Sequence, residues 1–144
     1  MQNYIFWLFC LLWPSLNFAQ LGVHGDIILN TSLALAGVDM HLETGILRSQ
    51  VEQVEVLFLD NAQTSGGDEN SYSEVLLRTS NTTAFDFPLG QQGRYLPVRI
   101  NANTAVTAAG QLMAASPSSL GPAPSTTSLA SNYYWNFQGQ GEAE

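Results

Sequence analysis

The chain has 144 residues, enough for one ordinary domain or two small ones. It carries 4 basic residues, all of them arginine, against 12 acidic residues, and its formal net charge is −8. Nucleic acids and anionic membrane surfaces need clustered cations, so this charge argues against both as partners. The absence of lysine also excludes Schiff-base and P-loop chemistry.

The first nineteen residues predict an export signal. Tyr4 to Trp13 is an unbroken apolar run, and as a helix it would rise about 15 Å, half of a hydrocarbon core. The run is too short for a transmembrane anchor, so a signal peptide over residues 1–19, cut after Ala19, is the better interpretation. The single cysteine, Cys10, lies in this segment, and we expect the mature protein to be secreted or on the cell surface without a thiolate or disulfide.

Residues 20–80 are expected to form short β-strands stacked in a solenoid-like fashion. From Asp26 to Leu59 apolar residues recur every second position, and glycines separate the runs. No segment shows the spacing of an amphipathic helix. The expected strands cover residues 26–30, 32–36, 38–43, 45–49 and 53–59.

Residues 81–137 are expected to begin a β-sandwich that lacks its closing strands, which makes the whole chain all-β. Strands are predicted near 72–78, 84–87, 95–100 and 132–137, and residues 103–115 fit either a weak strand or a weak helix. The segment 116–131, rich in proline, serine and threonine, predicts poor packing, and 138–144 predicts a disordered tail. Such a fold leaves an exposed edge that favours pairing with another chain.

The block from Ala84 to Val98 reads AFDFPLGQQGRYLPV and resembles a motif of the form FxFPxGxxGxYxPV. That motif occurs in exported, β-rich cell-surface modules of the Bacteroidota, many of which use type IX secretion. The resemblance extends over about residues 40–137 and implies export and β architecture, without any catalytic residue. It departs from the family at Glu74-Val75, where Gly-Pro is usual. The matching flanks are 45–47, 54–62, 71–76 and 133–135.

The motif predicts a hairpin that sets strand register and performs no chemistry. Its aromatic residues would anchor a pair of strands, its glycines permit a left-handed turn, and its prolines block further pairing. The residues with this structural role are Phe85, Phe87, Pro88, Gly90, Gly93, Tyr95 and Pro97.

Metal binding has little support in the residue pattern. His24 and His41 are the only histidines and show no HxH or HExxH spacing, so we expect them to be exposed and unliganded. The acidic loop between Asp60 and Asp68 would offer oxygens to calcium, but it lacks a DxDxDG sequence. A solvated acidic turn is the preferred interpretation, with calcium binding left open.

Catalysis has no better support, and we predict no catalytic residue, no cofactor and no enzyme activity. Glu52 and Glu55 would be the pair for a glycosidase. At this odd spacing on a strand they point to opposite sides, whereas the mechanism needs carboxyl groups that converge.

The aromatic strand near the C-terminus leaves two functions open. Tyr133, Trp135 and Phe137 share one face of a strand, and that face is expected to be core. The preferred function is then a non-catalytic structural or adhesion module, a spacer or stalk of a cell-surface protein or a fragment of one. The alternative is a carbohydrate-binding module that stacks sugars on Tyr133, Tyr134 and Trp135. Its partners would be cell-surface or matrix polysaccharide, or other copies of the parent protein.

Overall fold

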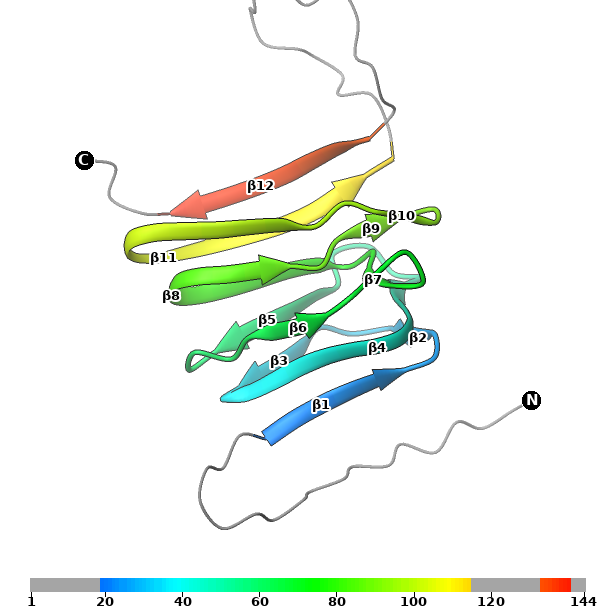
Figure 1. Ribbon diagram of the computed structural model, residues 1–144, viewed down its shortest axis with the longest axis horizontal. Helices are drawn as coiled ribbons and strands as arrows, with labels where there is room; N and C mark the ends of the chain where they lie inside the picture. Colours follow the sequence, from blue (N-terminus) through cyan, green and yellow to red (C-terminus); the bar gives the residue numbers. More distant parts are fainter. Residues whose placement is uncertain (1–18, 115–132, 141–144) are drawn as a thin grey trace, which may run out of the picture.

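The computed structural model describes residues 19–114 and 133–140, and within them every regular element is a β-strand (Figure 1). The all-β prediction is confirmed. The expected signal peptide, apart from Ala19, and the segment 116–131 lie outside the described residues. The strands are β1 (Ala19–His24), β2 (Ile27–Leu29), β3 (Leu33–Ala36), β4 (Val38–Ser49), β5 (Glu55–Leu59), β6 (Thr64–Gly66), β7 (Ser71–Ser73), β8 (Leu76–Phe87), β9 (Gly90–Gln91), β10 (Arg94–Tyr95), β11 (Val98–Met113) and β12 (Tyr134–Gln140).

Three parallel ladders join successive passes of the chain. We call residues 19–37, 38–62 and 63–79 the first, second and third passes. β4 pairs with β1 and β6 through its first half and with β2 and β7 through its second half, while β5 pairs with β3 and β8. These ladders are the stacked strands that the apolar spacing predicts, and their classification as a solenoid stays a prediction. Matching positions in the three ladders are Leu21–Met40–Thr64, Ile27–Leu47–Ser73 and Leu33–Val56–Leu77.

The core lies inside these ladders because alternate side chains point inward. In β5, Val56 and Phe58 are fully buried while their neighbours are half-buried, as a period of two requires. The same alternation buries Met40 and Leu42 in β4. Each such side chain contributes about 1.5–3 kcal/mol to folding. Val23 of the first pass and Leu77 of the third pass belong to the same buried cluster, so the core extends through all three passes.

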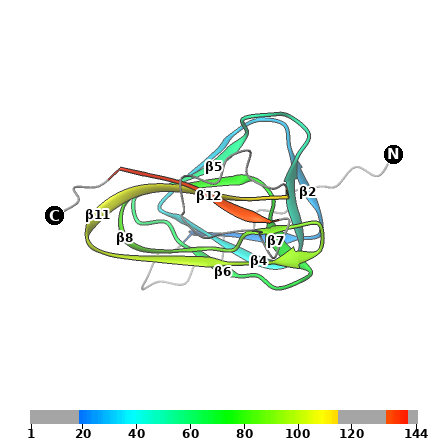
Figure 2. The ribbon, with the colours of Figure 1, turned by 90° about the horizontal axis from the view of Figure 1, so that it is seen from above.

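The motif block lies where the chain stops winding in parallel and turns back on itself. β8 bends at Asn81, which has a φ of 56°, and its second half continues toward β9. Gln92 and Gly93, both with positive φ, form the two-residue turn between β9 and β10, as in a type I′ hairpin. β11 then returns antiparallel to β8 (Figure 2). The hairpin thus reverses the direction of winding.

β8 crosses the boundary expected at residue 80 without interruption. Its first half pairs with both β5 and β11, and its second half with β11 alone. β11, β8 and β12 consequently belong to one mixed sheet with β3 and β5. The division into regions 20–80 and 81–137 stays a prediction.

Tyr72 of β7 explains why a glycine stands at position 90. A Cβ at Gly90 would overlap the buried Tyr72 ring. The Tyr72 hydroxyl accepts a hydrogen bond from the backbone N–H of Gly93 at 2.7 Å. The third pass therefore supports the hairpin turn through one aromatic side chain.

Four phenylalanine rings form a continuous stack that runs from the core to the surface. Phe58 lies 5.0 Å from Phe85, Phe85 lies 4.8 Å from Phe87, and Phe87 lies 5.3 Å from Phe137, measured between ring centroids. Tilted and edge-on contacts of this kind are favourable. The stack links the second pass to β12, the outermost strand of the sheet.

The expectation that Tyr133, Trp135 and Phe137 form a core face is wrong for two of the three residues. Trp135 is 48% exposed and Phe137 is 37% exposed, whereas Tyr133 packs partly buried against the core. The physical reason is that β12 pairs with β11 on one side and, among the described residues, with no strand on the other. β12 also reaches Gln140, into the expected tail, because Thr107 to Ala109 of β11 pair with its end.

Candidate functional site

The two histidines lie on the outer surface of the parallel ladders, each beside a side chain of a neighbouring strand. Nδ1 of His41 is 2.9 Å from the Ser65 hydroxyl oxygen, because the register places Ser65 of β6 directly beside His41 of β4. Nδ1 of His24 is 3.3 Å from Glu43. His41 is half-buried, which corrects the expectation that it is exposed. The long-range register that creates the His41–Ser65 pair leaves no local signal in the sequence.

The His41–Ser65 pair resembles a base and a nucleophile, but it lacks the rest of such a site. A catalytic dyad of this kind needs a group that orients the second ring nitrogen. Within the described residues no hydrogen bond joins Nε2 of His41 to a carboxylate. We therefore interpret the pair as a link between the second and third passes.

The acidic loop considered for calcium contains turns that satisfy their own hydrogen bonds. Asp68 accepts a hydrogen bond from the Asn70 backbone N–H at 2.7 Å, and its backbone pairs with Ser71. Asp60 and Asn61 both have positive φ, as in a tight turn. In the part of the chain that the structure describes, no three acidic, histidine or cysteine side chains lie close enough to hold a metal ion.

Glu52 and Glu55, the glutamates considered as a glycosidase pair, lie in different settings. Glu55 at the start of β5 accepts a hydrogen bond from Arg78 at 2.8 Å. Glu52 lies in the loop before β5, so the strand-alternation argument does not apply to it. Its carboxylate lines a groove that the sequence did not indicate.

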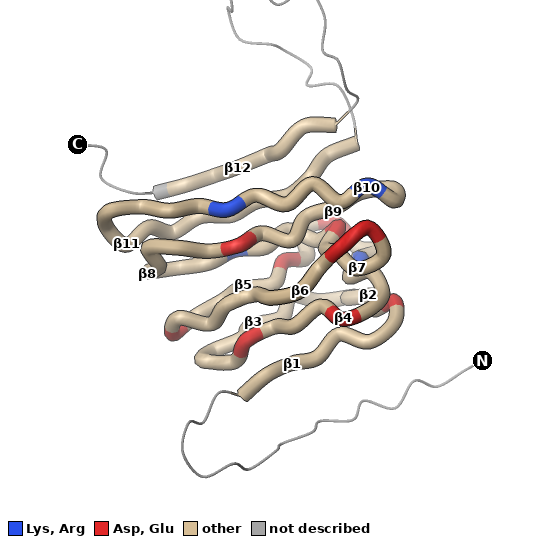
Figure 3. Tube along the Cα trace, in the orientation of Figure 1, with Lys and Arg blue, Asp and Glu red and all other residues tan. Residues whose placement is uncertain are grey.

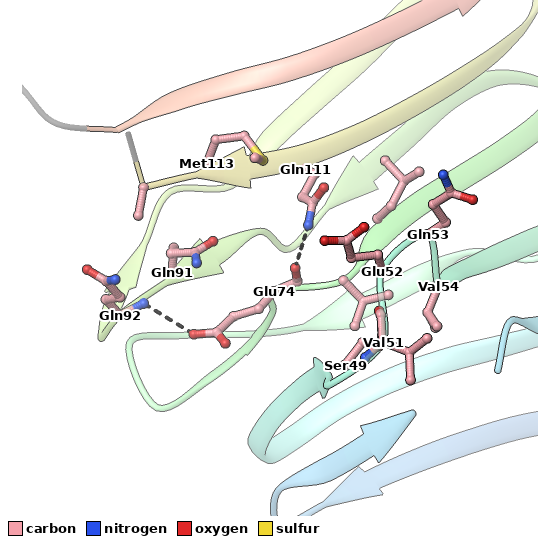
Figure 4. Close-up of a pocket in the computed structure, with 13 residues that line it drawn as sticks. Ser49, Val51, Glu52, Gln53, Val54, Glu74, Gln91, Gln92, Gln111 and Met113 are labelled. Atoms are coloured by element: carbon pink, nitrogen blue, oxygen red, sulfur yellow. Dashed lines mark hydrogen bonds between the residues drawn. The ribbon is translucent and has the colours of Figure 1, made fainter. Parts of the chain in front are cut away.

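This groove, which we call the glutamine groove, is a cavity of about 620 Å³ between the 49–54 loop, the start of β8, the β9–β10 turn and the end of β11 (Figure 4). Its apolar lining includes Val51 and Val54 on one side and Met113 of β11 on the other. Its polar lining includes Glu52, Gln53, Glu74, Gln91, Gln92 and Gln111.

Glu74 holds one wall of the glutamine groove in place. One carboxylate oxygen accepts a hydrogen bond from Arg48 at 3.0 Å, and the other accepts the backbone N–H of Gln92 at 3.2 Å. The Glu74 carbonyl oxygen accepts a hydrogen bond from Nε2 of Gln111 at 2.9 Å (Figure 4). The β9–β10 turn and the end of β11 are therefore both tied to one residue.

Arg48 joins all three passes through ion pairs. Its guanidinium lies 3.0 Å from Asp26 in the first pass and 3.0 Å from Glu74 after β7 in the third. Burial lowers the pKa of Arg48, but the charges of Glu74 and then Asp26 outweigh burial and raise it above its usual value. The guanidinium therefore remains charged and holds neighbouring passes together.

Replacing Arg48 by alanine is expected to lower the free energy of unfolding by about 1–2 kcal/mol. This value is smaller than the energy of buried charged hydrogen bonds because the Arg48 side chain is 40% exposed. Urea denaturation at low and high salt measures the effect, which should shrink in 1 M NaCl as the charges are screened. Arg99→Ala is the control, because its pair with Asp86 is longer and its side chain is 64% exposed. Equal losses in the two variants would contradict the prediction.

A second cavity, of about 490 Å³, lies beside β6 and is lined by the motif residues Pro88, Tyr95 and Pro97. Burial, followed by the charges of Asp86 and Asp68, raises the pKa of Tyr95 above its usual value. The phenol is protonated at neutral pH even at its usual pKa, and this environment favours the neutral form further. The motif thus borders a cavity as well as forming the turn.

The aromatic residues of β12 do not form one platform. Nε1 of Trp135 donates a hydrogen bond to the Leu96 carbonyl at 3.0 Å. This bond holds the indole against the segment between β10 and β11. The Tyr133 hydroxyl donates to the Gln92 side-chain oxygen at 3.4 Å, and Arg94 lies 5.6 Å from the centre of the Tyr133 ring. Tyr134 points to the opposite side of the strand from Trp135 because side chains alternate.

Acidic residues occur along most of the passes, whereas the few arginines lie apart from one another (Figure 3). Among the described residues, no helix has the length and apolar character needed to cross a membrane.

The chain matches no protein-family model, no curated protein and no solved structure. The likeness to exported Bacteroidota modules therefore rests on the motif residues, and membership of that family stays a prediction.

Proposed function

We propose that this chain is a non-catalytic exported module, a spacer or adhesion element of a cell-surface protein. The observation that supports it most is the use of charged side chains between passes. Arg48 bridges Asp26 and Glu74, and Arg78 bridges to Glu55 of the neighbouring strand. These charged side chains join one pass to the next, as a structural element requires.

The stacking of passes also suits a spacer. In stacked architectures each repeat contacts its neighbours, so length grows with the number of repeats. β1 and β12 lie at opposite ends of the described fold (Figure 1).

The β12 segment from Tyr134 to Gln140 contains no charged residue and no proline, the features that normally protect an edge strand from pairing. Such an edge is suited to adding a strand from another copy of the parent protein.

The proposal is tested by following export and activity of the whole chain. Expressed with its first nineteen residues in a Gram-negative host, the protein should leave the cytoplasm and begin at Gln20 by mass spectrometry. Beads coated with the exported protein should adhere to each other or to polysaccharide-coated surfaces. Turnover of a glycan or peptide substrate, abolished by one carboxylate substitution, would overturn the proposal, as would retention in the cytoplasm.

A carbohydrate-binding module is the second candidate, and the exposure of Trp135 favours it. An indole that is 48% exposed and held by a hydrogen bond to Leu96 presents a fixed apolar face of the kind on which sugar rings stack. Trp135→Ala should then abolish binding on an array of glycans. Tyr134→Ala on the other side of β12 is the matched control and should leave binding unchanged. Equal effects of the two substitutions would rule out the Trp135 face as the binding surface.

A further inference from the structure

The glutamine groove combines many uncommitted hydrogen-bonding groups in a small space. Within the described residues, the Glu52 carboxylate and the side-chain amides of Gln53 and Gln91 have no protein partner. Gln111 uses Nε2 on the Glu74 carbonyl and keeps its oxygen free. Gln92 accepts from Tyr133 and keeps its two N–H donors. The walls therefore offer both donors and acceptors.

Two of these glutamines adopt a backbone conformation that glutamine rarely takes. Gln53 has a φ of 64° and Gln92 a φ of 51°. The other described residues with positive φ, glycine excepted, are Asp60, Asn61 and Asn81, whose short polar side chains tolerate it. Gln92 takes this conformation as the first turn residue of the type I′ hairpin. Gln53 has no such hairpin around it, and its left-handed backbone is local strain at the edge of the groove.

The charge and the apolar lining of the groove limit the class of ligand that it can bind. Among the described residues, Glu52 and Glu74 are the only ionisable groups that line the groove, and Glu74 is paired with Arg48. The unpaired charge is therefore the Glu52 carboxylate, which disfavours an anion. Val51, Val54 and Met113 supply apolar surface for C–H groups. The volume of about 620 Å³ falls in the usual range of small-molecule sites. Hydroxyl groups, which both donate and accept, match carboxamides and a carboxylate better than anionic groups do.

We propose that the glutamine groove binds a neutral oligosaccharide, with Glu52 accepting hydrogen bonds from ring hydroxyls and the glutamine amides pairing with adjacent hydroxyls. A peptide fits less well, because its backbone offers one donor and one acceptor per residue and would seek a strand edge. This site is separate from β12 and goes beyond the proposed structural function.

The test is a titration of the ¹⁵N-labelled chain followed by NMR. Cellohexaose, xylohexaose and mannohexaose serve as neutral probes, hexagalacturonic acid as the anionic probe, and a random hexapeptide pool as the peptide probe. At least one neutral probe should shift the side-chain amide signals of Gln53, Gln92 and Gln111, and the anionic and peptide probes should not. No shift with any neutral probe, or equal binding of the anionic or peptide probe, would overturn the proposal.

Glu52→Ala should weaken binding of that neutral probe about tenfold or more, the expected loss of hydrogen bonds to a charged group. Glu69→Ala is the matched control, because Glu69 is an exposed acid in the turn before β7 and does not line the groove. Trp135→Ala should leave the groove shifts unchanged, which separates this site from β12. Equal weakening by Glu52→Ala and Glu69→Ala, or loss with Trp135→Ala alone, would refute the assignment. The spacer proposal would survive that result, because export and turnover test it independently.

Discussion

Replacing Phe85 by alanine is expected to lower the free energy of unfolding by about 3–5 kcal/mol. Phe85 is buried in the middle of the aromatic stack, with Phe58 on one side and Phe87 on the other. The substitution removes both ring contacts and leaves a cavity where the second pass meets β8. The free energy of unfolding of an ordinary domain is about 5–15 kcal/mol in total. The substitution would therefore remove a large part of the stability of the fold. Urea denaturation followed by tryptophan fluorescence and far-UV circular dichroism measures the loss.

Phe137→Ala is the matched control at the end of the same stack. Its ring contacts Phe87 but is 37% exposed, so its removal should cost only about 1 kcal/mol. If Phe85→Ala were no more destabilising than Phe137→Ala, the stack would not extend through a common core. The packing would then not support the structural role that we predict for the phenylalanines of the motif.

Replacing Gly45 by alanine should cost at least about 3 kcal/mol, combining left-handed strain with forced overpacking. Gly45 has a φ of 88°, and a Cβ there would overlap the backbone of Gly25 in the first pass. The Gly45 N–H also bonds to the Asn70 carbonyl in the third pass at 3.1 Å. Because backbone meets backbone at this corner, neither side can move away cheaply. Thermal and urea denaturation of the variant measure the effect.

Gly37→Ala separates the two causes of that loss. Gly37 has a φ of 63°, but nothing lies within 4 Å of the position that a Cβ would take. Its substitution should therefore show the conformational strain alone, about 1–2 kcal/mol. Similar losses at Gly37 and Gly45 would mean that the passes are not in backbone contact at the Gly45 corner.

Glycine at a corner also explains one difference between the expected and observed strands. The sequence predicts two strands, 38–43 and 45–49, because Gly45 interrupts the alternation. The structure contains a single strand, β4, from Val38 to Ser49, which bends at Gly45 and pairs with two different ladders. A break in local pattern marks a corner here, and only the neighbouring passes determine whether pairing continues through it.

Pairing with neighbouring strands determines the secondary structure of segment 103–115, for which the sequence leaves strand and helix open. Alanine there favours a helix and threonine favours a strand, so the local preferences oppose each other. β11 reaches Met113 because β8 and β12 flank it. β1 was not predicted for a related reason. Its sequence from Ala19 to His24 alternates Leu21 and Val23 with small or polar residues over only six positions, and its pairing with β4 makes it a strand.

Local sequence is enough to predict the charge, the β class and most inward-facing residues, because a period of two depends only on neighbouring positions. Val56, Phe58 and Phe85 are buried as that pattern indicates. The tertiary structure alone decided which strands lie side by side, and with them the Arg48 ion pairs, the exposure of Trp135 and the glutamine groove. These features join residues distant in the chain, and register between passes is set by packing and backbone pairing that no local pattern encodes.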